Sequence, residues 1–119
     1  MRKDQLFVEE HRELSLREID LIKWLLVTTN NLEFLEQIEK ARVISKCGCG
    51  CRTIDLEVVE YVSKFDRLIN LDAQGVSLED VPVDVILHIR HGLISELEIY
   101  AMDETEEFSL PEIDKLNVS

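Results

Sequence analysis

The sequence predicts an α+β fold in which N-terminal helices pack on a mainly antiparallel sheet of about 4–5 strands. Apolar residues recur at helical spacing as far as residue 40, and from residue 41 they alternate with polar residues as in strands. The 119 residues contain no linker-like stretch and no internal repeat. We therefore expect a single domain, 1–119, with a helical part at 4–40, a sheet at 41–101 and an acidic C-terminal tail at 102–119.

The segment "SLREIDLIKWLLVTTN", residues 15–30, carries the strongest helix signal. Ser15 and Glu18 have the spacing of a capping box, in which each side chain accepts a hydrogen bond from the backbone N–H of the other residue. Leucines and isoleucines then follow at helical spacing until the polar "TTN" ends the pattern. We expect a second helix at residues 32–40 and a further helical piece at residues 4–14.

The alternating pattern after residue 40 predicts the strands. "ARVISKC" and "RTIDLEVV" place apolar residues on one face and polar residues on the other. "RLINLDA" indicates another strand, and "QGVSLEDVP" indicates the loop that follows it.

The segment "VDVILHIRHGLISELEIYA", residues 83–101, predicts a hairpin. A two-residue turn at His91–Gly92 would pair Leu87 with Glu96, whereas a three-residue loop starting at Arg90 pairs apolar residues with each other and places the glycine in the left-handed position. We therefore expect the three-residue loop, with the pairs Ile89–Leu93, Leu87–Ser95, Val85–Leu97 and Val83–Ile99. The outer face then carries Asp84, Ile86, His88, Glu96, Glu98 and Tyr100.

The charge of the chain restricts its partners. Asp and Glu number 25 against 13 Lys and Arg, a net charge of −12. Such a chain repels nucleic acid and anionic lipid, so we expect neither as a partner. No apolar run approaches the roughly 18–20 residues that span a bilayer, and acidic residues interrupt the N-terminal region where a signal peptide needs an apolar core. These features predict a cytoplasmic protein with a surface suited to a basic protein partner, although acidity also serves solubility.

The cluster "CGCGC" holds every cysteine of the chain, Cys47, Cys49 and Cys51. In an extended segment the three thiols would share one face, and zinc would need a fourth ligand, for which His88 on the hairpin's outer face is the candidate. Flanking basic residues could instead activate the thiols for redox chemistry. We favour a structural role as small apolar residues, so we expect no cofactor and keep zinc as the alternative.

The sequence favours a binding protein over an enzyme. Nucleophile-elbow, phosphate-loop, zinc-protease and EF-hand motifs are all missing from it. Glu96 and Glu98 have the spacing of a carboxylate pair that could act in acid–base chemistry, but a solvated acidic face explains the same spacing more simply.

The segments "CGCGCRTIDL", "VPVDVILHIRHGLISELEIYAMDE" and "LPEIDKL" resemble a group of small bacterial proteins. That group combines a C-G-C-G-C cluster with a hairpin of the type G-x-L-S-x-L-E-I-Y and a late Leu-Pro, and the resemblance covers residues 41–116. It implies no particular activity and therefore assigns no catalytic residue. The chain departs from the group at Arg52, where a small residue or proline is expected, and at His91, where an aspartate is expected. Because the group is expected to have an aspartate at this turn position, the resemblance argues against His91 as a metal ligand.

These observations leave two functions. The first is a protein-interaction module, in concrete form an immunity protein that neutralises a basic toxin. Its expected contact residues are Asp84, Glu96, Glu98, Tyr100, Asp103, Glu104, Glu106 and Glu107. The alternative is a metal-binding or thiol-redox module built on Cys47, Cys49 and Cys51, with His88 as a metal ligand.

Overall fold

The computed structural model describes residues 7–48, 52–63, 66–102 and 108–118. The strands in these ranges are β1 (Phe7–Glu13), β2 (Ala41–Cys47), β3 (Ile54–Val58), β4 (Ile69–Val76), β5 (Pro82–Arg90), β6 (Leu93–Ala101) and β7 (Asn117–Val118). All seven belong to one sheet in the order β1-β2-β3-β6-β5-β4-β7, and each neighbouring pair is antiparallel. Strands that follow one another in the chain are neighbours except at two places, because β3 lies beside β6 instead of β4, and β7 lies beside β4 instead of β6.

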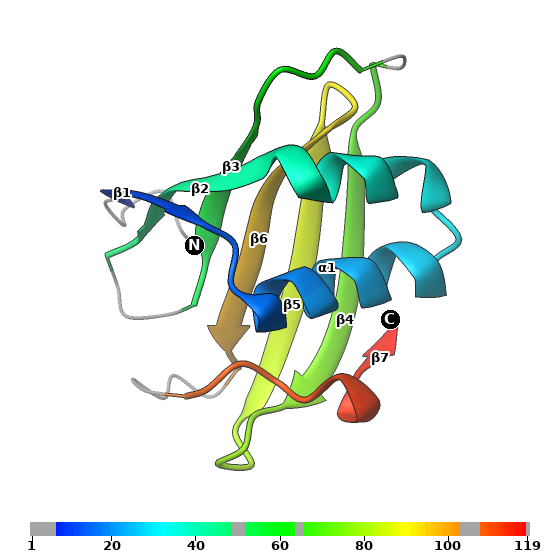
Figure 1. Ribbon diagram of the computed structural model, residues 1–119. Coiled ribbons are helices and arrows are strands. Elements are labelled where there is room, and N and C mark those ends of the chain that lie inside the picture. Colours follow the sequence, from blue (N-terminus) through cyan, green and yellow to red (C-terminus); the bar gives the residue numbers. More distant parts are fainter. Residues whose placement is uncertain (1–6, 49–51, 64–65, 103–107, 119) are drawn as a thin grey trace.

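Two helices cover one face of this sheet. The α-helix α1 (Leu16–Thr28) and the 3₁₀ helix η1 (Leu32–Lys40) both cross that face, in front of β6, β5 and β4 in Figure 1. The core lies between the two layers, and its fully buried side chains include Leu21, Ile22, Leu25, Leu26, Val83, Val85, Leu87, Ile89, Leu97 and Ile99. None of the helices in the described ranges combines the length and apolarity needed to cross a membrane.

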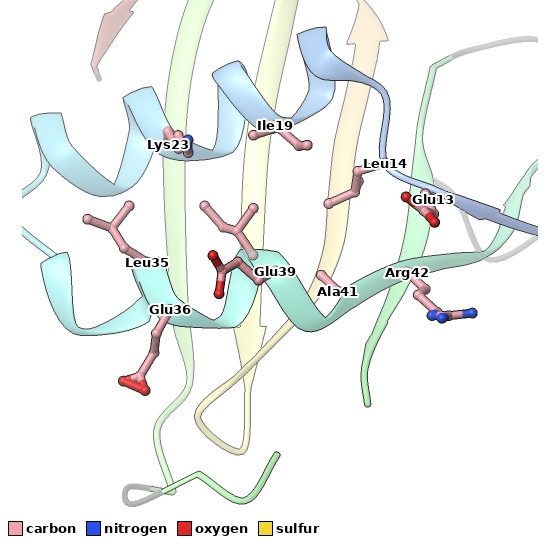
Figure 2. Close-up of a pocket in the computed structure, with 10 residues that line it drawn as sticks. Glu13, Leu14, Ile19, Lys23, Leu35, Glu36, Glu39, Ala41 and Arg42 are labelled. Carbon is pink, nitrogen blue, oxygen red and sulfur yellow. The ribbon is translucent and has the colours of Figure 1, made fainter. Parts of the chain in front are cut away.

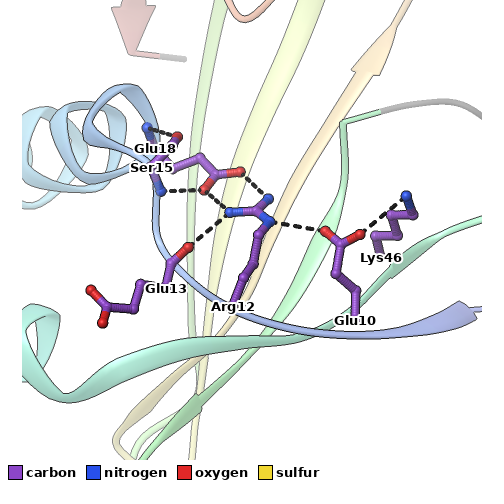
Figure 3. Close-up of polar contacts among 6 residues, drawn as sticks. All are labelled: Glu10, Arg12, Glu13, Ser15, Glu18 and Lys46. Atoms are coloured by element: carbon purple, nitrogen blue, oxygen red, sulfur yellow. Dashed lines mark hydrogen bonds and ion pairs between the residues drawn. The ribbon is translucent and has the colours of Figure 1, made fainter.

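The capping box predicted at the start of α1 is confirmed. Ser15 Oγ accepts a hydrogen bond from the Glu18 N–H at 3.2 Å, and Glu18 Oε1 accepts one from the Ser15 N–H at 2.8 Å. Arg12 on β1 also donates two hydrogen bonds of 2.9 Å to the Glu18 carboxylate and another to Glu10, which in turn pairs with Lys46 on β2 (Figure 3). One ionic chain therefore joins the helix start to the first two strands.

Glu18 is the buried member of this ionic network, and its surroundings change the pKa of its carboxyl group. Glu18 is 6% exposed, and burial alone would raise its pKa. The hydrogen bonds from Arg12 and Ser15 outweigh burial, so the pKa of Glu18 is lowered. Glu18 therefore stays ionised where it is needed, both as the cap of α1 and as the partner of Arg12.

The helix η1 is attached to the hairpin through one amide side chain. Gln37 is 2% exposed; its Nε2 donates to the Gly92 carbonyl at 2.8 Å and its Oε1 accepts from the Ile94 N–H at 2.9 Å. The side chain thus satisfies two buried backbone groups at the end of the hairpin, where the strand ladder cannot reach them.

The predicted fold, with helices over residues 4–40 and a sheet of about 4–5 strands, is wrong: the sheet of the described chain has seven strands. The two additional strands, β1 and β7, are its edges. Five of the seven residues of β1 are exposed, so the segment lacks the alternation that marks a strand in a sequence. Its extended conformation comes from pairing with β2. The helix at 32–40 is also a 3₁₀ helix, which no sequence pattern had indicated.

The predicted loop at "QGVSLEDVP" is wrong over its first three residues, because β4 continues to Val76. The reason lies in the C-terminal segment, which packs on this strand: β7 pairs with Ala73 and Gln74. A Cβ on Gly75 would lie only 2.8 Å from Leu116 Cδ2, so a larger residue at this position would displace the Leu116 side chain where the segment crosses the strand. Phe108 and Leu116 are buried, so the C-terminal segment is docked on the domain.

The three-residue loop predicted for the hairpin is also wrong. The turn consists of His91 and Gly92 alone, with φ of 56° and 73°, the left-handed pair that two-residue hairpin turns favour. A bulge then leaves Ser95 as the extra residue on β6 and restores apolar-to-apolar pairing beyond it. The pairs on the two sides of the bulge are Ile89–Ile94 and His88–Glu96, followed by Leu87–Leu97 and Val85–Ile99.

This register exchanges the roles of two neighbouring residues. Ile94 is 1% exposed in the core, and Leu93, which the three-residue loop would have buried, is only half-buried. We expect Ile94→Ala to lower the free energy of unfolding by about 2–5 kcal/mol, as core truncations do, and Leu93→Ala to lower it by clearly less. Urea denaturation of the two variants measures the difference. A larger loss at Leu93 would contradict the bulged register.

Candidate functional site

The face of the sheet opposite the helices gathers carboxylates from four adjacent strands. Antiparallel pairing aligns Asp55, Glu96, His88 and Asn70 in one row across β3, β6, β5 and β4. The next rows align Glu98, Ile86 and Asp72, and then Tyr100, Asp84 and Gln74. We call this surface the acidic face and define it by Asp55, Asp72, Asp84, His88, Glu96, Glu98 and Tyr100.

The charged groups of the acidic face are recessed between their neighbours. Asp84 and Glu96 are 6% and 3% exposed, and the side chains of Glu98 and His88 are 13% and 16% exposed. Burying carboxylates in this way is costly unless other groups compensate their charge. The groups that compensate the charge of these carboxylates therefore indicate which kind of ligand the face could bind.

His88 lies at the centre of the recessed groups. Its Nδ1 is 2.9 Å from Asn70 Oδ1 and its Nε2 is 2.8 Å from Glu98 Oε1. Arg90 donates to Glu96 Oε1 at 2.9 Å, with its own side chain 46% exposed. The imidazole and the guanidinium thus hold two neighbouring glutamates that are on the same strand and face.

A second group of acids lies beside the first. The Tyr100 hydroxyl donates to Asp84 Oδ2 at 2.8 Å, and this bond, together with burial and the nearby acids, raises the pKa of Tyr100 to about 12. Burial, a hydrogen bond with Asp84, and the charges of Asp84 and Glu98 raise the pKa of Asp72 to about 6. Within the described ranges, Oδ1 of Asp72 and Oδ1 of Asp84 are buried and accept no hydrogen bond from a donor group. When Asp72 is protonated, its carboxyl group can donate a hydrogen bond to the carboxylate of Asp84.

Half of the predicted contact residues meet on this face. Asp84, Glu96, Glu98 and Tyr100 share it, and their cross-strand pairs confirm the predicted set of outward-facing hairpin residues. The predicted tail residues Asp103, Glu104, Glu106 and Glu107 lie outside the described residues. Sequence reasoning missed Asp55, Asn70 and Asp72, because alternation placed them on a polar face without showing that β3 and β4 lie beside the hairpin.

The structure does not bring His88 to the described part of the cysteine cluster. Cys47 ends β2 and is 3% exposed, and Cys49 and Cys51 lie outside the described residues. Two strands, β3 and β6, separate β2 from β5, so Cys47 and His88 are on strands about 14 Å apart at the usual sheet spacing. The burial of Cys47 agrees with an apolar structural role. His88 instead groups with Glu96 and Glu98, and their ligand atoms all lie within 4.8 Å of one another.

A separate hollow of about 610 Å³ lies on the helix side of the molecule, between α1 and η1. Figure 2 shows Leu14, Ile19 and Leu35 directed into the space between the two helices, with Glu36, Glu39 and Arg42 among the charged residues around it. Because its lining residues come from both helices and from the strands that adjoin them, the sequence pattern of neither helix indicated it. Its opposite charges and apolar floor do not select a ligand class, whereas the acidic face selects cations.

In comparisons with protein-family models, with curated proteins and with solved structures, this chain matches none of them. The function is therefore inferred from the geometry and charge of the acidic face.

The raised pKa of Asp72 makes a specific pH dependence testable. An acid whose pKa rises on folding binds its proton more tightly in the native state, so its contribution to stability is lost as pH increases from about 4 to about 6. We expect Asp72→Asn to raise the melting temperature relative to wild type at pH 7 and to lose most of that advantage at pH 4. Calorimetry at both pH values tests this, with Asp20→Asn on the exposed side of α1 as control. An equal effect of Asp72→Asn at the two pH values would contradict the assignment.

Proposed function

We propose that this protein is a protein-interaction module that binds a basic partner through the acidic face. Its concrete form is a cytoplasmic immunity protein that neutralises a basic toxin. The observation that carries the proposal is the gathering of five carboxylates, Asp55, Asp72, Asp84, Glu96 and Glu98, on the sheet face that the helices leave uncovered.

The ordering of these carboxylates favours binding. Hydrogen bonds from His88, Arg90 and Tyr100 hold three of them in place, so a partner's lysine or arginine would meet acceptors whose side-chain freedom is already lost. Partly desolvated carboxylates also attract a cation more strongly than fully hydrated ones do.

The rest of the face supplies what an interface needs around such charges. Tyr100 is 37% exposed at the end of its row, which suits an aromatic anchor for a partner. The net charge of −12 would steer a basic partner toward the molecule and speed its association. The resemblance to small bacterial proteins adds the expectation of a bacterial source, in which immunity genes adjoin their toxin genes.

The partner to test first is therefore the protein encoded by the adjacent gene. We expect it to be basic, to arrest growth when expressed alone and to be harmless when this protein is co-expressed. Purified components should associate with a rate constant that falls as salt rises, because screening weakens the steering charges. Neutral products from the adjacent genes, or no rescue of growth, would overturn the immunity form of the proposal.

Two double variants locate the interface on the molecule. Asp72→Asn with Glu98→Gln removes two charges from the acidic face, and Glu36→Gln with Glu39→Gln removes two from the exposed side of η1. Both change the net charge equally, so a general charge effect would slow association equally. We expect the first pair to lower the association rate constant roughly tenfold at low salt and the second pair to have little effect. Equal effects would mean that the acidic face is not the binding surface.

A further inference from the structure

We propose that His88, Glu96 and Glu98 form a binding site for a divalent transition-metal ion, with Zn²⁺ as the best-suited member of the class. This site goes beyond the proposed partner binding and does not depend on it. The three residues come from adjacent positions on β5 and β6, where the cross-strand pairs His88–Glu96 and Ile86–Glu98 place them on the acidic face. Each contributes one ligand atom, and these atoms lie within 4.8 Å of one another.

The imidazole of His88 is already oriented as a ligand. Asn70 Oδ1 lies 2.9 Å from Nδ1, so the amide oxygen accepts the Nδ1–H and directs Nε2 toward the two glutamates. A hydrogen bond from the second nitrogen to an oxygen acceptor is the usual arrangement around metal-binding histidines, since it fixes the ring and the tautomer. Asn70 therefore acts as a positioning residue on the neighbouring strand β4.

The spacing of the ligand atoms suits a metal at bonding distance. Ligands about 2.1 Å from zinc in a tetrahedral arrangement are about 3.4 Å apart. His88 Nε2 and Glu98 Oε1 are 2.8 Å apart, which is hydrogen-bonding distance. A metal would take the place of this hydrogen bond, its proton would leave to solvent, and the two atoms would move apart by about 0.6 Å. Glu96 would turn from Arg90, whose side chain is 46% exposed and can move into solvent.

The surroundings favour a dication over other occupants. Glu96 is 4% exposed at its side chain and Glu98 13%, so both carboxylates are largely withdrawn from water, and a dication would neutralise their two charges. Asp55 lies beside Glu96 in the same row, and Asp72 lies two strands from Glu98 in the next. Asp84, in the following row, keeps Oδ1 buried without a donor among the described residues, so the surrounding face holds further negative charge.

The ligand types select among metals. Imidazole suits zinc, cobalt, nickel and copper, whereas calcium and magnesium prefer oxygen ligands alone and more of them. Three protein ligands leave a fourth position for water, so the site has the ligand count of an open zinc site. The structure therefore assigns the site to first-row transition metals and not to Ca²⁺ or Mg²⁺.

The test measures Zn²⁺ binding to the intact protein by competition with a chromogenic chelator, and Co²⁺ binding by visible absorption. We expect one equivalent of Zn²⁺ per chain, no competition from excess Ca²⁺ or Mg²⁺, and a Co²⁺ spectrum without a thiolate charge-transfer band. His88→Ala and the isosteric Glu98→Gln should each raise the dissociation constant at least tenfold. Asn70→Ala, which leaves all three ligands in place, should raise it by about 10- to 100-fold.

The matched control is His91→Asn. His91 pairs with Asp66 at 3.1 Å, but both side chains are 85% exposed and no third ligand from the described residues joins them, so this variant should bind Zn²⁺ as wild type does. Circular dichroism of each metal-free variant verifies the fold, and Glu98→Gln decides the matter if His88→Ala does not fold. Three results would overturn the site: no stoichiometric Zn²⁺ in the wild type, unchanged affinity in folded variants of His88 and Glu98, or a cobalt–thiolate band, which would assign the metal to the cysteines.

Discussion

The register of the β5–β6 hairpin is the constraint on which both faces of the sheet depend. The two-residue turn at His91–Gly92 fixes how the strands start, and taken alone it would align apolar residues with acids. The bulge at Ser95 shifts β6 by one residue. Beyond it, Leu97 and Ile99 face the helices, while Glu96 and Glu98 face away from them. Without the extra residue at Ser95, the side chains of β6 that face the helices and those that lie on the acidic face would change places.

The helices and the edge strands follow from this arrangement. The apolar face of the hairpin must be covered, and α1 and η1 cover it with Gln37 joined to the turn itself. The connection from β1 into α1 is fixed by the bidentate pair of Arg12 with Glu18, since Glu18 also caps the helix. The same carboxylate therefore orders an edge strand and a helix start, which explains why it is buried and ionised.

The acidic face collects the carboxylates that the core excludes, and both proposed activities are ways of compensating their charge. A basic partner would do so with lysine or arginine side chains, and a metal ion would do so at His88, Glu96 and Glu98. The two can coexist, because a bound dication would cancel only part of a surface that also includes Asp55, Asp72 and Asp84. Metal content would then alter the attraction for a basic protein, so partner binding should be compared with and without Zn²⁺.

The sequence by itself determined the features that arise from neighbouring residues. The capping box of Ser15 and Glu18, the apolar stripe of α1 and the outer face of the hairpin are all properties of local spacing, and all were correctly predicted. The inner face was predicted except next to the turn, where Ile94 and not Leu93 enters the core. Only the tertiary structure decided what depends on distant residues. β1 and β7 are strands because β2 and β4 offer them backbone partners, and Asn70 meets His88 because β4 lies beside β5. Local patterns state which face a side chain occupies, but the order of strands, which sets its neighbours, follows from packing the whole chain.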